Sequence, residues 1–413
     1  MKQKQKLAVV LLMAWSTYVA AYLCRANLST VLDKLAVTLD VSVEYVGAAS
    51  SVFFVTYAVG QLLNGFLGDR LHPHKFVMLA LVMTGGINVA LAFQKSAPLF
   101  LVLWGLNGFC QSAFWGTLLR LLSCYATEPQ RKNVSLAMSA STVVGYLTSW
   151  VILSWLFRER SSTPYFLIPG LVALALIPLW FLLSRKLPFY ETGSRSVAPP
   201  LRAVARDFLQ DRLYFLCVLS MLVGAIQEGA AFWLPMIFTT VLDLGEGSLL
   251  LLALIPVAKL FGVTVVRTLL SRTGDDVRKV GLISGSGSCL VAVILLLTSG
   301  HTSVFTVLLI ACLVAVTAAV CWIVVSYLPL CFAHRNMVST IVGVMDFSSY
   351  VGAAIMSGTL GGLLLRYGWP VLPMVWTGLT AISLLLLLTG AGACLRRKGQ
   401  PRLTVEKRTD CTK

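Results

Sequence analysis

The run Gly65-Phe66-Leu67-Gly68-Asp69-Arg70-Leu71-His72-Pro73-His74-Lys75 is a short polar break between two apolar stretches, 45–67 and 76–94. Each stretch is long enough to cross roughly 30 Å of hydrocarbon as an α-helix. A helix satisfies its backbone hydrogen bonds internally, so it is a form in which such a stretch can cross a membrane. The run is therefore predicted to be the loop between the second and third of a series of membrane-spanning helices.

Apolar stretches of this kind continue along the whole chain of 413 residues, of which 57% are hydrophobic and only 12% are charged. Soluble domains average about 25% charged residues, so this composition excludes most soluble classes. The predicted spans lie near 7–32, 45–67, 76–94, 98–121, 133–156, 165–184, 213–241, 248–270, 280–299, 303–328, 338–363 and 369–392. The predicted fold class is an all-α, multi-pass membrane protein of twelve transmembrane helices.

The basic residues predict the orientation of these helices. With the N-terminus inside, 24 of the 33 Lys and Arg residues fall in cytoplasmic segments, five in outer loops and four within apolar runs. This bias follows the positive-inside rule, so both termini are expected to be cytoplasmic, in a plasma or inner cell membrane. The net charge of +16 is thereby explained by orientation, and no nucleic-acid partner is expected.

A polar stretch at 185–212 divides the chain into two halves of six predicted spans each. The expected units are an N-terminal half (1–184), a cytoplasmic linker (185–212), a C-terminal half (213–395) and a basic tail (396–413). The run from Ser141 to Gly145 matches the run from Ser348 to Gly352, and the loop after span 2 matches the loop after span 8 at a similar offset. Two parallel repeats predict a substrate cavity between the halves, near the middle of the membrane.

The loop of residues 65–75 resembles the G-x-x-x-D-R…K motif between helices 2 and 3 of the major facilitator superfamily. Within that superfamily, Tyr22-Leu23-Cys24-Arg25-Ala26-Asn27 resembles the Y-L-x-R-x-N motif of the organophosphate:phosphate antiporters, the glycerol-3-phosphate and hexose-phosphate transporters. The resemblance implies the major facilitator fold and transport of a phosphorylated metabolite. The residues expected to latch the cytoplasmic side closed in one conformation are Asp69, Arg70 and Lys75.

One position departs from the resemblance. Phosphate-exchanging members carry a second arginine on helix 7, and counting back from Trp233 and Pro235 places Gln227 there in this chain. The departure speaks against obligatory exchange with inorganic phosphate, and it leaves phosphate or a proton open as the counter-ion. The residues expected to contact substrate are Tyr22, Arg25, Asn27, Gln111, Trp115, Gln227, Trp233 and Lys259.

Charged residues inside predicted spans are functional candidates because burying a charge in a membrane costs free energy. Arg25 offers a planar donor fork for phosphate or carboxylate, and the alternative is that it extends to the interface. Glu228 and Lys259 either form a structural ion pair or act as a proton-coupling carboxylate and an anion contact. Asp346 is a second coupling candidate, with a structural or gating role as its alternative. Arg120 and Arg267, near helix ends, are expected to extend to the interface.

No catalytic, metal or cofactor site is predicted. The four histidines are expected in loops, the ten cysteines show no metal-ligand spacing, and no nucleotide-binding P-loop motif is present. We therefore expect a monomeric secondary transporter in the lipid bilayer that moves a small organic anion by alternating access. The four charges of Arg25, Lys259, Glu228 and Asp346 sum to zero, which keeps a proton-coupled carboxylate or zwitterion transporter open. A membrane sensor of a phosphorylated metabolite is the alternative from another class.

Overall fold

The computed structural model is built of helices, and it describes residues 3–157, 161–187, 201–210, 212–234, 237–238, 248–300, 303–335 and 337–391. Twelve of its helices are long and apolar enough to cross a membrane, which confirms the predicted number of spans. The predicted tail, 396–413, lies outside the described residues.

The N-terminal half contains six spans. Short helices follow the first span, and the fifth span includes a π-helical turn. Its elements are α1 (Gln3–Ala26), η1 (Leu28–Thr30), α2 (Leu32–Leu39), α3 (Val43–Gly68), α4 (Pro73–Ala92), α5 (Ala97–Tyr125), η2 (Glu128–Gln130), α6 (Arg131–Leu147), η3 (Thr148–Leu153), α7 (Ser154–Leu156) and α8 (Thr163–Lys186). The first span was predicted to run to residue 32 and ends at Ala26. The side chain of Asn27 accepts a hydrogen bond from the Leu28 amide there, which caps a separate 3-10 turn.

The C-terminal half contains the other six spans. Its elements are α10 (Tyr214–Gly224), η4 (Ala225–Ala230), η5 (Ala231–Trp233), α12 (Ser248–Arg272), α13 (Val277–Leu297), α14 (Val304–Cys321), η7 (Trp322–Tyr327), η8 (Leu328–Arg335), α15 (Val338–Tyr367) and α16 (Val371–Leu388). The elements η3, η4 and η7 are π-helical turns continuous with α-helices. Such turns occur frequently at functional sites.

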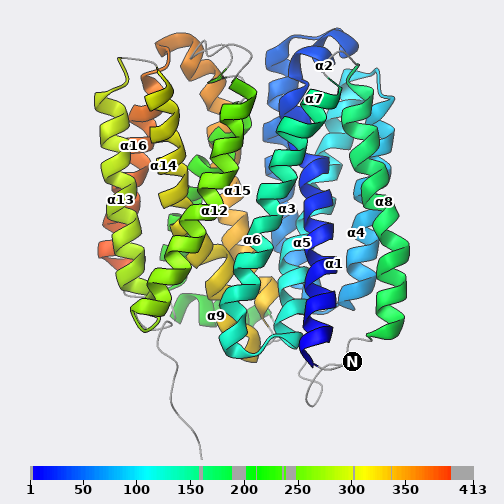
Figure 1. Cartoon of the computed structure of the whole chain (residues 1–413), viewed down its shortest axis with the longest axis vertical. Helices are drawn as coiled ribbons and strands as arrows, with labels where there is room; N and C mark the ends of the chain where they lie inside the picture. The colour runs from blue at the N-terminus through cyan, green and yellow to red at the C-terminus, as the bar shows by residue number, and fades with distance from the viewer. Residues whose placement is uncertain are drawn as a thin grey trace, which may run out of the picture.

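The linker between the halves contains a helix of its own. Within the stretch predicted as linker, α9 (Leu201–Gln210) lies across one end of the bundle, at the same end as the start of α1 (Figure 1). Because successive spans alternate in direction, the loop that follows α3 lies at this end too. We call it the linker end, and it is the end that the basic residues predict to be cytoplasmic.

The two halves meet along α3 with α15 and along α6 with α12. Figure 1 shows the N-terminal half on the right and the C-terminal half on the left, with α15 and α12 facing α3 and α6. Glycine permits the close approach of α3 to α15. A Cβ added at Gly343 would come within 2.3 Å of the Gln61 carbonyl oxygen and 3.0 Å of the Gly65 Cα.

Candidate functional site

A cavity lies between the two halves, and both halves contribute to its wall. The residues from the N-terminal half are Tyr18, Tyr22, Trp115, Ser139, Thr142 and Val143. The residues from the C-terminal half are Glu228, Lys259, Leu260, Val263, Ala318, Cys321, Trp322, Val325, Ser326, Asp346, Ser349 and Tyr350. The cavity therefore lies where the sequence repeat predicts the substrate site.

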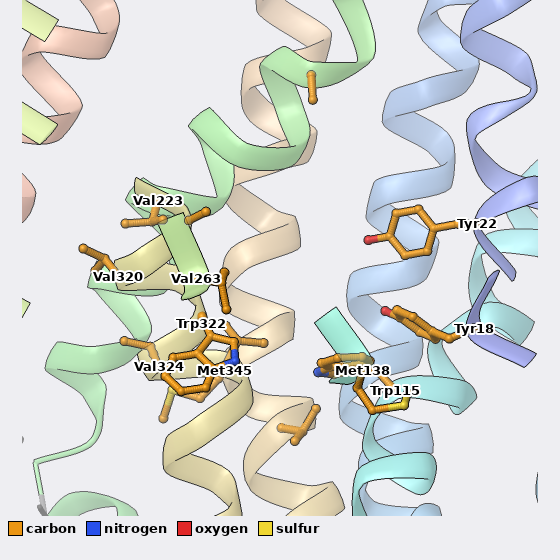
Figure 2. Packing of buried hydrophobic residues seen from close by; sticks show 14 of the residues in the cluster. Tyr18, Tyr22, Trp115, Met138, Val223, Val263, Val320, Trp322, Val324 and Met345 are labelled. Atoms are coloured by element: carbon orange, nitrogen blue, oxygen red, sulfur yellow. The ribbon is translucent and has the colours of Figure 1, made fainter. Parts of the chain in front are cut away.

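Aromatic residues make up much of the wall on the side of the N-terminal half. Tyr18 and Tyr22 are one helical turn apart on α1, and their ring centroids lie 5.3 Å apart. Trp115 of α5 packs on Tyr18 at 4.6 Å. Figure 2 shows both tyrosine hydroxyls pointing away from α1 toward the C-terminal half, where Trp322 lies. This wall offers flat apolar faces with hydroxyl groups at their edges.

Arg25 lies beside the cavity and not at the membrane interface. Its side chain is only 6% exposed, which excludes the alternative that it extends to solvent. Five aromatic rings lie within 6 Å of its guanidinium carbon; these belong to Tyr22, Phe53, Phe54, Tyr57 and Tyr350. The face of an aromatic ring attracts a cation, so these five rings stabilise the buried guanidinium without neutralising its charge. Its Nη2 has no hydrogen-bond partner among the described residues.

Glu228 is the centre of a cluster of charges. Its Oε1 accepts a hydrogen bond from Lys259 Nζ at 2.9 Å, so the pair proposed from the sequence is present. Its Oε2 lies 3.5 Å from Arg25 Nη2 and accepts a hydrogen bond from the Tyr146 hydroxyl at 3.3 Å. One carboxylate thus faces a cation from each half, because Arg25 is on α1 and Lys259 on α12. Asp346 of α15 lines the same cavity and is 6% exposed.

Four of the residues expected to contact substrate lie elsewhere. Asn27 donates to Asn88 Oδ1 and to the Tyr165 carbonyl, and Gln111 donates to the Cys24 carbonyl. These bonds hold the helices of the N-terminal half together. In this conformation, then, Asn27 and Gln111 are packing contacts behind the cavity wall.

The other two of these residues lie inside the C-terminal half. Gln227 Nε2 donates to the Val314 carbonyl at 2.9 Å and also bonds the Thr317 hydroxyl, both on α14. Trp233 Nε1 donates to the Ser357 carbonyl at 2.9 Å. Although Gln227 takes the sequence position of an arginine, its side chain points away from the cavity, and the cation opposite Arg25 is Lys259.

The predicted latch residue Asp69 connects the two halves at the linker end. Its two carboxylate oxygens accept hydrogen bonds from the backbone amides of Ser339 at 3.0 Å and Thr340 at 2.7 Å, in the first turn of α15. Negative charge is favourable at the first turn of a helix. Burial raises the pKa of Asp69 above its usual range, and the amide donors and Arg120 oppose that rise.

Arg120 was expected to extend to the interface, and this expectation is wrong. The side chain turns inward and donates to the carbonyls of Gly68 at 2.6 Å and Leu71 at 3.0 Å. Its Nε lies 3.9 Å from Asp69 Oδ1. Arg120 therefore ties the loop after α3 to α5. The carbonyls at the end of a helix lack partners within the helix, and Arg120 supplies a donor to them.

The other two predicted latch residues are exposed, Arg70 in the loop after α3 and Lys75 in the first turn of α4. The guanidinium of Arg70 stacks on Phe66 at 3.2 Å and donates to the Phe66 carbonyl, and Lys75 is exposed. Nearby, Lys132 of α6 forms an ion pair with Asp275, and Arg267 of α12 bonds Asn133. At the linker end the two halves are therefore joined twice, by Asp69 with the start of α15 and by these contacts of α6 with α12 and the turn that follows it.

Several residues of the site were not expected from the sequence: Tyr18, Trp322 and Tyr350 line the cavity, Tyr57 lies beside Arg25, and Tyr146 bonds Glu228. A weak signal was present for Tyr18, since it lies on the same face of α1 as Tyr22 and Arg25, at intervals of four and three residues. No spacing along one helix pointed to the others because they reach the site from four other elements: α3, α6, η7 and α15. His74 was expected in a loop and is instead buried in the first turn of α4.

The family follows from a comparison with known proteins. A model of the Major Facilitator Superfamily matches residues 14–357. The chain belongs to this superfamily. It is therefore a multi-pass membrane protein and a secondary transporter by family, not an enzyme. Among the described residues, no group of three His, Cys, Asp or Glu side chains is placed to hold a metal ion.

Two known relatives match short parts of the chain, and one of them is named for a phosphorylated metabolite. A probable hexose phosphate transport protein of Chlamydia trachomatis is 24% identical over 157 residues, 38% of this chain and 34% of that protein. The membrane sensor protein UhpC of Escherichia coli is 30% identical over 124 residues, 30% of this chain and 28% of the sensor. The matched part of the chain thus spans about a third of the length of these relatives.

A third relative matches over most of its length. The phosphoglycerate transporter protein of Salmonella typhimurium is 21% identical over 391 residues, 87% of this chain and 83% of that protein. These relatives confirm the resemblance to transporters of phosphorylated metabolites. Among solved structures, the proton:xylose symporter XylE superposes with a TM-score of 0.73 at 12% identity, over 94% of this chain and 96% of XylE. That likeness confirms the fold.

Proposed function

We propose that this superfamily member moves a small organic anion, a phosphorylated metabolite, across the membrane by alternating access. The observation that carries the proposal is the buried guanidinium of Arg25 beside the cavity, with Nη2 free of hydrogen-bond partners among the described residues. A buried donor without a partner costs about 1–3 kcal/mol or more, and an oxyanion removes that cost. A guanidinium also suits the planar, two-oxygen edge of a phosphate or carboxylate.

The second anion contact in this proposal is Lys259, which approaches from the C-terminal half. A substrate held by cations from both halves stabilises the closed arrangement more than either open one, and this coupling drives alternating access. Tyr22 and Trp115 would pack on the organic part of the substrate, since both line the cavity. Two relatives of the chain are named for transport of hexose phosphate and of phosphoglycerate.

A second candidate function is proton-coupled transport of a carboxylate or zwitterion. The two cations near the cavity are balanced by Glu228 and Asp346, so a substrate with two negative charges meets no net positive charge there. Either carboxylate would then bind and release the coupled proton. A sensor function is a third candidate, because a relative bears that name.

Uptake by the purified protein in proteoliposomes separates these candidates. The substrates would be labelled glucose 6-phosphate, 3-phosphoglycerate and unphosphorylated carboxylates such as lactate, each tested with and without an imposed pH gradient. We expect uptake of a phosphorylated compound, abolished by Arg25→Ala. Uptake of lactate alone, driven by the pH gradient, would favour the second candidate. Binding of a phosphorylated compound without uptake would favour a sensor.

A further inference from the structure

Glu228 occupies the position between the two cations that an anionic substrate would need. Lys259 Nζ lies 2.9 Å from one carboxylate oxygen and Arg25 Nη2 lies 3.5 Å from the other. The cations belong to different halves of the molecule, so the carboxylate bridges the halves as a bound substrate would. A structural ion pair needs only Lys259 and Glu228, and it leaves the contact with Arg25 unexplained.

The two contacts of Glu228 differ in quality. The contact with Lys259 is a hydrogen bond of ordinary length, whereas Arg25 Nη2 makes no hydrogen bond to any described residue. Glu228 thus neutralises Arg25 without accepting a hydrogen bond from its Nη2. A phosphate oxygen that approached Arg25 at about 2.7–2.9 Å would make the charge-assisted bond that Glu228 does not make. An anion of the substrate class therefore has a free-energy advantage over the carboxylate at this position.

We propose that Glu228 is a built-in substitute for the substrate anion. It neutralises Arg25 and Lys259 while the cavity is empty, and it moves aside when the substrate anion binds. The local backbone suits such a movement, because Glu228 lies in the π-helical turn η4. A π turn holds one residue more than an α turn needs, so a change to α pitch would rotate the side chain at low cost.

This inference rests on the proposed function and adds a property of the transport cycle. A carrier whose empty cavity holds two unpaired cations cannot close without an anion, because burying unpaired charges costs several kcal/mol. With Glu228 between the cations, the empty cavity can close and the carrier can return without cargo. The protein would therefore carry out net transport, and its substrate would not have to be exchanged for a second anion.

Binding of inorganic phosphate tests the role of Glu228 directly. The full-length protein in detergent would be titrated with phosphate in a buffer without other oxyanions, and binding followed by the change in tryptophan fluorescence and in melting temperature. Trp115 and Trp322 line the cavity and provide the signal. We expect Glu228→Gln to bind phosphate about tenfold or more tightly than the wild type, since the competing carboxylate is gone. Glu228→Asp, which keeps the charge, should bind as weakly as the wild type.

Asp346→Asn is the matched control. It removes one negative charge from the same cavity wall without vacating the position between the two cations. Equal tightening in Asp346→Asn and Glu228→Gln would overturn the proposal, because it would show a general effect of cavity charge. If Glu228→Gln melts at a lower temperature, phosphate should restore its melting temperature to near the wild-type value. Failure of phosphate to tighten or stabilise Glu228→Gln would also overturn the proposal.

Efflux from proteoliposomes tests the consequence for transport. Vesicles loaded with labelled 3-phosphoglycerate or glucose 6-phosphate would be diluted into buffer with or without the same unlabelled compound outside. We expect the wild type to release label into anion-free buffer and Glu228→Gln to release it only in exchange. A wild type that only exchanges would overturn the inference while leaving the proposed function in place. Tight phosphate binding by Glu228→Gln without transport of either probe by the wild type would support the role of Glu228 and contradict the proposed function.

Discussion

The guanidinium of Arg25 and the carboxylate of Glu228 lie 3.5 Å apart, across the boundary between the two halves of the molecule. Arg25 is on α1 and Glu228 is on the π-helical turn that follows α10. Because the two residues belong to different halves, a change in the charge of either one should alter how strongly the halves attract each other at the cavity. The expected effects of substitution at the cavity and at the linker end follow from this link.

Arg25→Lys should lower the affinity for a phosphorylated substrate by about 10- to 100-fold. This is the loss of a charge-assisted hydrogen bond worth roughly 1.5–3 kcal/mol, because lysine keeps the charge and loses the donor fork. Transport kinetics and the melting temperature would be measured together. Arg267→Lys is the control, since Arg267 is partly exposed and bonds Asn133 at the linker end, away from the cavity wall. Normal substrate affinity in Arg25→Lys would rule out Arg25 as the anion contact.

Asp69→Asn should slow turnover while leaving substrate binding near normal. Both Asp69 oxygens accept from backbone amides of α15, and asparagine has only one acceptor oxygen, so the closed linker end is weakened. A lower maximal transport rate at unchanged binding affinity is the expected result. Asp40→Asn is the control, because Asp40 is exposed in the left-handed turn that ends α2, a conformation that asparagine also adopts. A parallel loss of binding and turnover would indicate misfolding instead.

Neutralising Glu228 alone should destabilise the protein by about 3–5 kcal/mol, because two buried cations then lack their carboxylate. Lys259→Met alone should cost less, because Glu228 still faces Arg25. The double variant Glu228→Gln with Lys259→Met should recover much of the melting temperature and still fail to transport, since an anion contact is missing. Wild-type uptake by the double variant would assign the pair a purely structural role.

The ion pair of Lys132 with Asp275 provides the comparison for that experiment. The two lysines are equally exposed, at 18%, but Asp275 is 34% exposed against 10% for Glu228, so water screens the pair of Lys132 and Asp275 more. Lys132→Met should therefore cost about 1 kcal/mol or less. Melting temperatures of the two sets of variants, measured in the same detergent, would show whether burial makes the difference.

Gly343→Ala should destabilise the closed linker end by about 1–3 kcal/mol. The added Cβ would come within 2.3 Å of the Gln61 carbonyl oxygen, and backbone on both sides prevents relief by a side-chain movement. A cysteine introduced on α15 by Ser339→Cys would report opening of this end through its rate of alkylation. The parent chain without this substitution would give the background from the native cysteines. Gly378→Ala is the control, since a Cβ at Gly378 meets no atom within 4 Å. An unchanged alkylation rate in Gly343→Ala would show that the approach of α3 to α15 does not limit opening.

The amino-acid sequence by itself determined the number of spans, their division into two halves and the family. Apolar stretches about twenty residues long must become helices in a membrane, because their backbone groups find no other partners there. The same reasoning singled out Arg25, Glu228 and Lys259, since a charge within such a stretch needs a partner or a polar cavity. Asp69 was identified by its motif, and its partners on α15 were not, because they lie 270 and 271 residues further along the chain.

Only the tertiary structure decided which residues surround the cavity. Gln227 and Lys259 are both polar residues within apolar stretches, yet packing turns Gln227 into the α14 interface and Lys259 toward Glu228. Arg120 lies near a helix end, where an arginine normally extends to water, and the uncapped carbonyls after α3 turn it inward. The direction of a polar side chain on a buried helix depends on the neighbours that surround it. Those neighbours come from distant parts of the chain, and sequence spacing along one helix does not specify them.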